Sequence, residues 1–193
     1  MGCRPSSSIF CMRPTLMVSS TSTPDDNAPP APAIAAREER LETVAAQVAA
    51  IDELVGLATQ KIQVFDFDLA EGGWNGAARI DALASFMRRA RNPRFDVIVH
   101  DTRWIETSGA RLLRLLRTFG HAMTIYKTGP EAASAMDPLI IVDQRHYLHR
   151  YHVSQPRATL SIGVAQAAMP FVNRFEEIWA TGEPGLSGTV LGL

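Results

Sequence analysis

Residues 136–152 read MDPLIIVDQRHYLHRYH, and this stretch decides the fold. It holds two segments, residues 139–143 and 146–151, whose branched and aromatic side chains are typical of β-strands. A third such segment follows at residues 158–164. Because no helical pattern separates the three segments, we expect antiparallel strands that pair with one another and extend one sheet.

The sequence on either side of this strand cluster supplies helices and further strands. A last helix is predicted over residues 165–180, from its apolar side chains at helical spacing. Upstream, strand patterns alternate with helix patterns, in the order residues 61–67 (strand), 77–90 (helix), 95–100 (strand), 108–119 (helix) and 123–127 (strand). Such alternation predicts right-handed crossovers between parallel strands. We therefore expect an α/β fold, with a mixed, mainly parallel sheet flanked by helices.

The N-terminal part of the chain divides into a tail and a helix. Residues 1–33 are rich in Ser, Thr, Pro and Ala, and such a segment cannot bury enough apolar surface to offset the entropy of ordering. We expect this tail to be disordered. Residues 34–59 carry apolar side chains at three- and four-residue spacing, which predicts a helix. A single α/β domain should thus cover residues 34–182, with a loose C-terminal end at 183–193.

The net charge of −1 hides an uneven distribution of charge along the chain. Before Asn75 there are ten acidic and five basic residues. Positions 75 to 160 hold thirteen Lys or Arg and seven Asp or Glu, an excess of six positive charges. This distribution favours a surface that faces an anion, or self-association of complementary charges. The simpler interpretation is that arginines solvate the helices.

Cysteine usage and hydropathy indicate the compartment. Cys3 and Cys11 both lie in the predicted tail, so the domain contains no disulfide framework and a reducing compartment fits. No run of residues approaches the ~18 apolar residues that span a bilayer, and the first residues lack a secretory signal. We therefore expect a cytoplasmic protein without a membrane partner. The glycines at positions 72, 73 and 76 match no phosphate-cradling motif, and we expect no cofactor.

The order of elements and two local motifs resemble one repeat of the phospholipase D-like family. Residues 140–143 (IIVD) are similar to the strand and aspartate in the family's H-x-K-x-x-x-x-D motif, and residues 175–179 (FEEIW) to the F-x-x-x-W that closes many of its repeats. The resemblance covers residues 61–180 and implies a single phospholipase D-like repeat. A generic α/β sandwich shares the same order of elements.

The same alignment implies that the catalytic pair of the family is missing. With Asp143 on the motif's aspartate, Met136 stands at the histidine position and Pro138 at the lysine position. In the family, one histidine attacks phosphorus, a second protonates the leaving group, and the lysines stabilise the oxyanion. Methionine can neither attack phosphorus nor protonate a leaving group, and proline carries no cation for the oxyanion, so we assign no catalytic residue. Since the family brings two motifs together from two repeats or two subunits, the resemblance also implies a homodimer.

The chain also resembles an uncharacterised bacterial domain that occurs alone or after an N-acetyltransferase domain. This likeness implies an accessory module and an acetyltransferase-type partner. The main functional prediction is therefore a non-catalytic binding or accessory module that recognises an anionic ligand or a protein partner.

Three histidines in the strand cluster suggest a metal site at first sight. His146, His149 and His152 are spaced by three, but on a strand His149 faces away from the other two, so we predict no metal site. The strand instead predicts a basic, aromatic edge suited to phosphate or nucleic acid, or simply a solvated face. The candidate ligand residues in this region are Asp143, Arg145, Arg150, His152 and Arg157.

A second candidate group follows the strand at residues 95–100. His100, Asp101 and Arg103 lie where loops at the carboxyl ends of parallel strands gather ligand-binding groups. They support an alternative function, an acid/base hydrolase or transferase of unrelated mechanism, although no nucleophile is identified. The other interpretation is a local cap at the strand end.

Nucleic-acid binding is a further alternative. Arg111, Arg114 and Arg117 form a stripe on one helical face, and Arg88 and Arg91 belong to the preceding basic stretch. The isoelectric point of about 6.5 is low for a dedicated nucleic-acid binder, so this alternative is not favoured.

Overall fold

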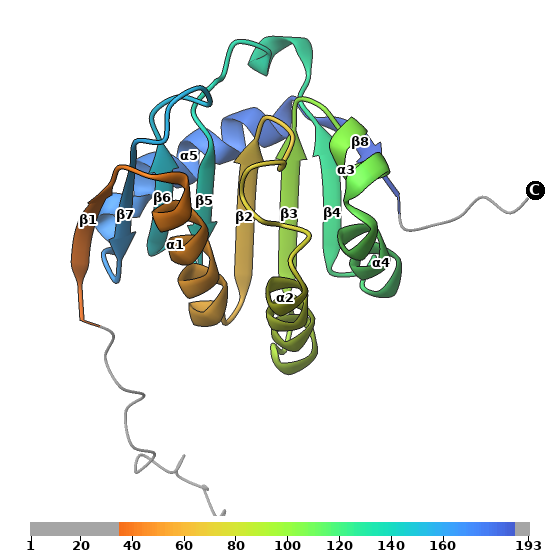
Figure 1. Cartoon of the computed structure of the whole chain (residues 1–193), viewed down its shortest axis with the longest axis horizontal. Coiled ribbons are helices and arrows are strands. Elements are labelled where there is room, and N and C mark those ends of the chain that lie inside the picture. Colours follow the sequence, from red (N-terminus) through yellow and green to blue (C-terminus); the bar gives the residue numbers. More distant parts are fainter. Residues whose placement is uncertain (1–34, 188–193) are drawn as a thin grey trace, which may run out of the picture. The chain divides into compact units, whose positions relative to one another are not determined.

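Three buried, apolar strands form the centre of the sheet: β2 (Lys61–Asp66), β3 (Arg94–Val99) and β4 (Met123–Lys127). They are parallel to one another because helices connect them, α2 (Ala77–Arg89) before β3, and α3 (Arg103–Ser108) with α4 (Ala110–Thr118) before β4. The computed structural model describes residues 35–187. Within these residues the sheet has eight strands, in the order β1-β7-β6-β5-β2-β3-β4-β8 (Figure 1).

The predicted strand cluster is confirmed. β5 (Leu139–Val142), β6 (His146–Arg150) and β7 (Ala158–Ile162) are antiparallel neighbours, and β5 is antiparallel to β2. In the turn after β5, Asp143 and Gln144 have φ angles of 51° and 56°, the left-handed conformation that tight hairpins need. The sheet is mixed, as predicted, but parallel pairing is confined to the β2–β3 and β3–β4 pairs.

Residues 34–59 do not form the single helix predicted from their spacing. Residues 37–41 form an edge strand, β1 (Arg37–Leu41), which pairs antiparallel with β7. The helix α1 (Val44–Leu57) begins only after Thr43, whose side-chain oxygen accepts a hydrogen bond from Ala46 N. Because β1 is exposed on both faces, except at Leu41, its sequence REERL lacks the alternation that marks a half-buried strand.

The C-terminal end also differs from the prediction. Part of the segment predicted to be loose, residues 183–193, forms the edge strand β8 (Glu183–Leu186), which is antiparallel to β4. This strand was not predicted because it contains Pro184 and Gly185, and both residue types are rare in β-strands. The predicted disordered tail at residues 1–33 lies outside the described residues.

Helices cover both faces of the sheet (Figure 1). α1, α2 and α4 pack on one face, where Ile62 and Val64 of β2 belong to the larger apolar core. α5 (Ala165–Ala180) crosses the other face and packs with Phe65 of β2 in a second core. Successive residues of β2 thus face opposite layers. None of the helices in residues 35–187 has the length and apolar character that crossing a membrane requires.

Candidate functional site

At one edge of the sheet β2 and β3 end and β5 begins, and this edge holds the two residues that the motif alignment sets at the histidine and lysine positions. We call it the strand-end edge. Because β5 is antiparallel to β2, with Leu139 opposite Phe65, the segment before β5 lies beside the carboxyl end of β2. Met136 and Pro138 therefore lie at this edge, both half-buried. Arg150 N donates to the Pro138 carbonyl oxygen over 2.9 Å, so β6 ends here too.

His100 holds the connection between β4 and β5 onto the strand-end edge. Its Nε2 is 2.6 Å from the Ala135 carbonyl oxygen, and its Nδ1 is 2.7 Å from Thr128 Oγ1. Since a carbonyl oxygen can only accept, Nε2 donates to Ala135, while Nδ1 pairs with the Thr128 hydroxyl, which can donate or accept. The ring also contacts Phe65 and Phe67, with centroids 5.4 and 5.7 Å away. Both ring nitrogens are thus engaged by the protein itself.

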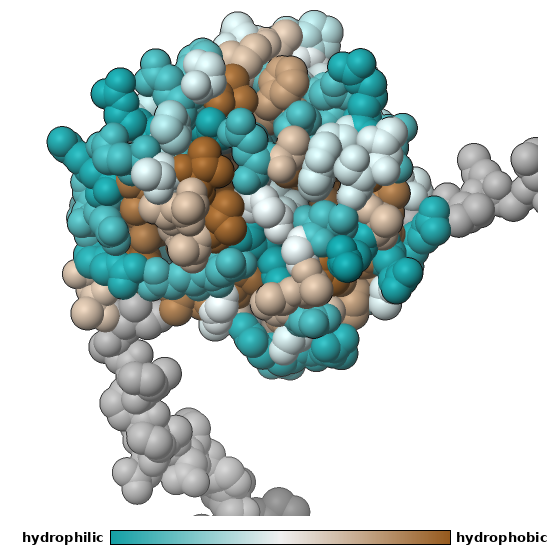
Figure 2. Space-filling model, viewed as in Figure 1, coloured by the Kyte–Doolittle hydropathy of each residue, from teal (hydrophilic) through white to brown (hydrophobic). Residues whose placement is uncertain are grey.

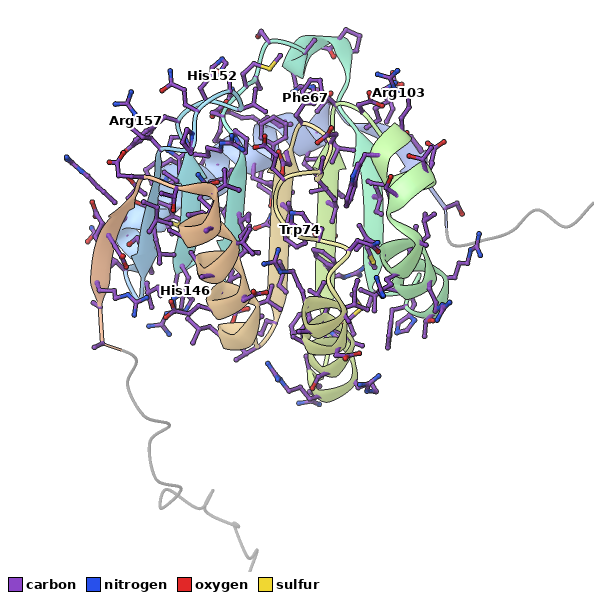
Figure 3. All side chains as sticks on the ribbon, viewed as in Figure 1. Phe67, Trp74, Arg103, His146, His152 and Arg157 are labelled. Carbon is purple, nitrogen blue, oxygen red and sulfur yellow. The ribbon has the colours of Figure 1, made fainter. Side chains whose placement is uncertain are left out.

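Asp101 and Arg103 form a local ion pair in the loop after β3. Arg103 Nη2 lies 2.5 Å from Asp101 Oδ2, and hydrogen bonds from the Arg103 side chain and backbone lower the pKa of Asp101 to about 2. The Arg103 side chain is 86% exposed and lies well apart from His152 (Figure 3). Neither Asp101 nor Arg103 lines the cavities that Arg150 lines. The structure therefore does not bring Asp101 and Arg103 into one site with Arg150.

Arg150 is the buried cation of the strand-end edge, only 8% exposed. Its Nε donates to the Gln155 carbonyl oxygen over 2.6 Å, and its Nη1 donates to Glu71 Oε2 over 2.7 Å. Arg150, Asp66 and Glu71 together line two cavities, of about 30 and 200 Å³. Asp68 lines the larger one. Three carboxylates therefore face one guanidinium.

Asp66 is the most perturbed acid of this group. The pKa of its carboxyl is raised to about 6, mainly by burial, with smaller upward contributions from the Asp68 and Glu71 carboxylates. The hydrogen bond from Phe67 N and the charge of Arg150 act in the opposite direction. Sequence reasoning missed Asp66 and Glu71, although Asp66 directly follows a buried strand and so met the criterion applied to His100.

His149 faces the opposite layer, as the alternation of β6 predicted. Its ring packs against Phe171 of α5 at 4.7 Å between centroids. Nε2 lies 3.9 Å from an Asp137 carboxylate oxygen, and Arg174 Nη2 lies 3.4 Å from the other oxygen. Burial lowers the pKa of His149, against the smaller effect of Asp137. The imidazole is therefore mainly neutral at pH 7.

Two other candidate residues lie at the opposite edge of the sheet. The Asp143 carboxylate accepts hydrogen bonds from Thr59 N, Thr59 Oγ1, Gln60 N and Lys61 N, at 2.7 to 2.8 Å. It thus joins the α1–β2 connection to the β5–β6 hairpin. Arg145 follows it in the same turn and is exposed.

The remaining candidates lie in the loop between β6 and β7. His152 and Arg157 are exposed, and the strand ends at Arg150, so His152 does not share a strand face with His146 as predicted. His146 lies at the other end of the sheet (Figure 3), where its Nδ1 accepts from Gly163 N. Within residues 35–187 no three His, Cys, Asp or Glu side chains are grouped to hold a metal ion. Ligand binding by the eight candidate residues remains a prediction.

A separate groove lies between α2 and α4, on the side of the sheet that α1, α2 and α4 cover. Its volume is about 330 Å³. We call it the α2–α4 groove, and it is lined by Ala77, Ile80, Asp81, Ala84, Arg88, Arg111, Arg114, Leu115, Thr118 and Phe119. The arginines were visible in the sequence, but their convergence was not, because it requires α2 and α4 to pack side by side.

Solved structures of low sequence identity share this fold. TrmBL2, an archaeal chromatin protein whose structure shows a novel mode of DNA binding, has a TM-score of 0.56 and 12% identity over 77% of this chain. The chain spans about half of TrmBL2, 54% of its length. Nuc, a phospholipase D family member from Salmonella typhimurium, gives 0.52 and 12%, over 79% of this chain and 99% of Nuc. NucT from Helicobacter pylori gives 0.50 and 9%, over 78% and 100%.

The topology and these likenesses define an α/β domain with a phospholipase D-like fold, which confirms the fold that the resemblance implied. The model of a family described as a domain of unknown function, DUF7931, matches residues 43–187. The chain belongs to this family. No curated protein matches the sequence.

Proposed function

We propose that this chain is a binding or accessory module that uses a phospholipase D-like fold without phospholipase D-type catalysis, and that it recognises an anionic ligand or protein partner. One observation carries the proposal. Met136 and Pro138 occupy the strand-end edge at the positions that the motif alignment gives to the catalytic histidine and lysine. A thioether cannot replace the imidazole nucleophile, and proline supplies no cation for an oxyanion.

The charges around these two residues support the same conclusion. Asp66, Asp68 and Glu71 face the edge, and Glu71 already pairs with Arg150. A phosphodiester would therefore meet net negative charge instead of the cations that stabilise its transition state. His100 has both nitrogens engaged, so it does not replace the missing nucleophile.

Recognition of an anion is supported by arginines of α2 and α4 that form no ion pair within residues 35–187. Arg88 and Arg114 have no carboxylate within ion-pair distance among residues 35–187. Positions 75 to 160, which include both, carry the excess of six positive charges. Unpaired guanidinium groups attract carboxylates and phosphates, which they bind in a bidentate manner.

A chromogenic phosphodiester, bis(4-nitrophenyl) phosphate, tests the absence of catalysis. The purified chain should release no nitrophenol above the buffer rate between mildly acidic and mildly alkaline pH. Turnover that disappears in Asp66→Asn or His149→Gln, but persists in the exposed control Arg91→Ala, would show that the strand-end edge is catalytic and would overturn the proposal.

We further propose that the module is a cytoplasmic homodimer. Residues 35–187 contain no cysteine, which suits a reducing compartment. Figure 2 shows a hydrophobic patch over α1, where Val44 is 38% exposed and Ala45 and Ala49 are exposed as well. A second copy would cover this patch.

Light scattering at micromolar concentration tests the dimer. The wild-type chain should have twice the monomer mass, and Val44→Glu combined with Ala49→Glu should have the monomer mass. A monomeric wild type contradicts the dimer. An acetyltransferase-type partner is a separate proposal, which co-purification with a neighbouring acetyltransferase would test.

A further inference from the structure

We propose, building on the anion binding proposed for this module, that the α2–α4 groove is the binding site and that its ligand is a small phosphorylated molecule with an apolar or planar body. Three guanidinium groups line the groove, Arg88 from α2 and Arg111 and Arg114 from α4. Apolar side chains, among them Ile80, Leu115 and Phe119, line the groove together with these cations, and we call them the apolar floor. The ligand class follows from this combination of cations and apolar surface.

Helical spacing explains why the side chains meet. On α2, Ile80, Ala84 and Arg88 are separated by four residues each, so they lie along one side of the helix. On α4, Arg111 and Leu115 are separated in the same way. The basic side of α4 faces the side of α2 that ends in Arg88, and the groove forms where these two sides adjoin.

Asn75 orients one of the three cations before any ligand arrives. Its Oδ1 accepts from Arg111 N over 2.9 Å, and its carbonyl oxygen accepts from Arg111 Nη1 over 3.2 Å. Its Nδ2 donates to the Ser108 carbonyl oxygen over 2.7 Å. Asn75 therefore fastens the start of α2 to the start of α4, which fixes the width of the groove at this end. Preorganised cations bind an anion with less loss of side-chain entropy.

The chemistry of the lining favours a phosphoryl group. A guanidinium group can donate two parallel hydrogen bonds to the oxygens of a phosphate. A terminal phosphate has enough oxygens to accept from more than one guanidinium at once. Ile80, Leu115 and Phe119 provide an apolar surface beside the cations, which a carbon skeleton would cover. Inorganic phosphate alone would leave that surface exposed to water.

The short groove and its single acid favour a small molecule over a polymer. α4 has nine residues, so it is about 14 Å long at 1.5 Å per residue. Asp81 lies in the groove and would repel a polyanion that ran along it. A compact ligand that places its phosphate among the arginines and its apolar body on the floor carries fewer negative charges past this carboxylate than a polyanion does.

Calorimetric titration of the purified full chain with inorganic phosphate, phenyl phosphate and a short single-stranded DNA tests the site. Phenyl phosphate should bind more tightly than inorganic phosphate. Arg88→Ala combined with Arg114→Ala should weaken phenyl phosphate binding by at least about tenfold, since each removes charged hydrogen bonds. Asp81→Asn should strengthen it. Arg91→Ala is the matched control, because Arg91 is exposed and lies outside the groove lining.

The outcomes separate this inference from the function on which it rests. Phosphate binding that survives the double substitution, or that Arg91→Ala weakens equally, would place the anion elsewhere and leave the proposed function standing. DNA that binds more tightly than phenyl phosphate and depends on the same arginines would refute the ligand class. If none of the anions binds, this inference fails together with the anion recognition on which it rests, and recognition of a protein partner is left. Unchanged thermal unfolding of the variants shows that they are folded.

Discussion

Replacing Asp143 tests whether the aspartate of the motif serves stability in this chain. Oδ2 of its carboxylate accepts from Thr59 N and Thr59 Oγ1, and Oδ1 accepts from Gln60 N and Lys61 N. These bonds connect segments more than 80 residues apart in the sequence. Asp143→Ala removes all four acceptor contacts and keeps the turn otherwise intact.

The expected loss follows from the exposure of the donors and from the backbone. A hydrogen bond contributes about 1 kcal/mol net, and water can replace the carboxylate at Thr59 and Gln60, which are exposed, but less well at Lys61 N, which is part-buried. The lost bonds therefore cost about 2 kcal/mol together. Alanine in the left-handed conformation that Asp143 adopts adds about 1 kcal/mol. We expect Asp143→Ala to lower the free energy of unfolding by about 3 kcal/mol.

Urea unfolding followed by circular dichroism measures this loss. Asp143→Gly removes the bonds but relieves the backbone strain, so it should be less destabilised than Asp143→Ala by about 1 kcal/mol. Asp143→Asn keeps one acceptor oxygen and should lie between the wild type and Asp143→Gly. An alanine variant within about 0.5 kcal/mol of the wild type, the range of ordinary surface substitutions, would refute the structural role.

Three further substitutions address residues in or next to the loop before α2. Arg79 is buried, lies over the Trp74 ring and donates to the carbonyl oxygens of Gly72 and Val48, so Arg79→Met should lower the free energy of unfolding by about 2 kcal/mol in urea. The pKa of Asp66 rises from 3.8 to about 6 on folding, so the folded state binds the proton between these values and stability falls as pH rises through them. Asp66→Asn should therefore increase stability at pH 7 and flatten the profile between pH 4 and 6. A Cβ at Gly72 would overlap the buried Trp74 indole, so Gly72→Ala should lower the melting temperature by several degrees.

A different result would contradict the prediction for each of these three variants. Arg79→Met with wild-type stability would mean that its hydrogen bonds and ring contact are replaced by water at no cost. An unchanged pH profile in Asp66→Asn would show that another group titrates between pH 4 and 6. For Gly72→Ala, the exposed helical position Gly56 supplies the control, because a Cβ there meets nothing. Equal melting temperatures of the two variants would contradict the steric argument.

Elements with a strong periodic pattern could be predicted from the sequence, and those without one could not. The helix predicted over residues 165–180 matches α5, and the strand pattern at 123–127 matches β4. β1 was not predicted because most of its side chains are exposed, so its sequence shows no apolar alternation. Its partner, β7, lies far along the chain, so local sequence contained no sign of the pairing either. Pairing across the whole chain, and not local preference, creates this strand.

The candidate site was less predictable than the fold because it depends on which elements become neighbours. Arg150 was selected from its strand, but its partner Glu71 comes from a loop 79 residues earlier in the sequence. His100 was selected as a chemical group, whereas its contacts with Thr128 and Ala135 show that it holds a loop. A residue type indicates what a side chain can do, and only its neighbours decide which of those roles it has.

The pairing of β1 with β7 constrains the route by which the domain folds. Arg37 pairs with Ile162, which is synthesised 125 residues later. β1 therefore has no strand to pair with during most of translation, whereas β2, β3 and β4 can pair as they emerge. Such a contact of high sequence separation slows folding. Closure of this edge is accordingly a late step. After β7 has formed and before β1 pairs with it, β7 presents open backbone groups to other nascent chains.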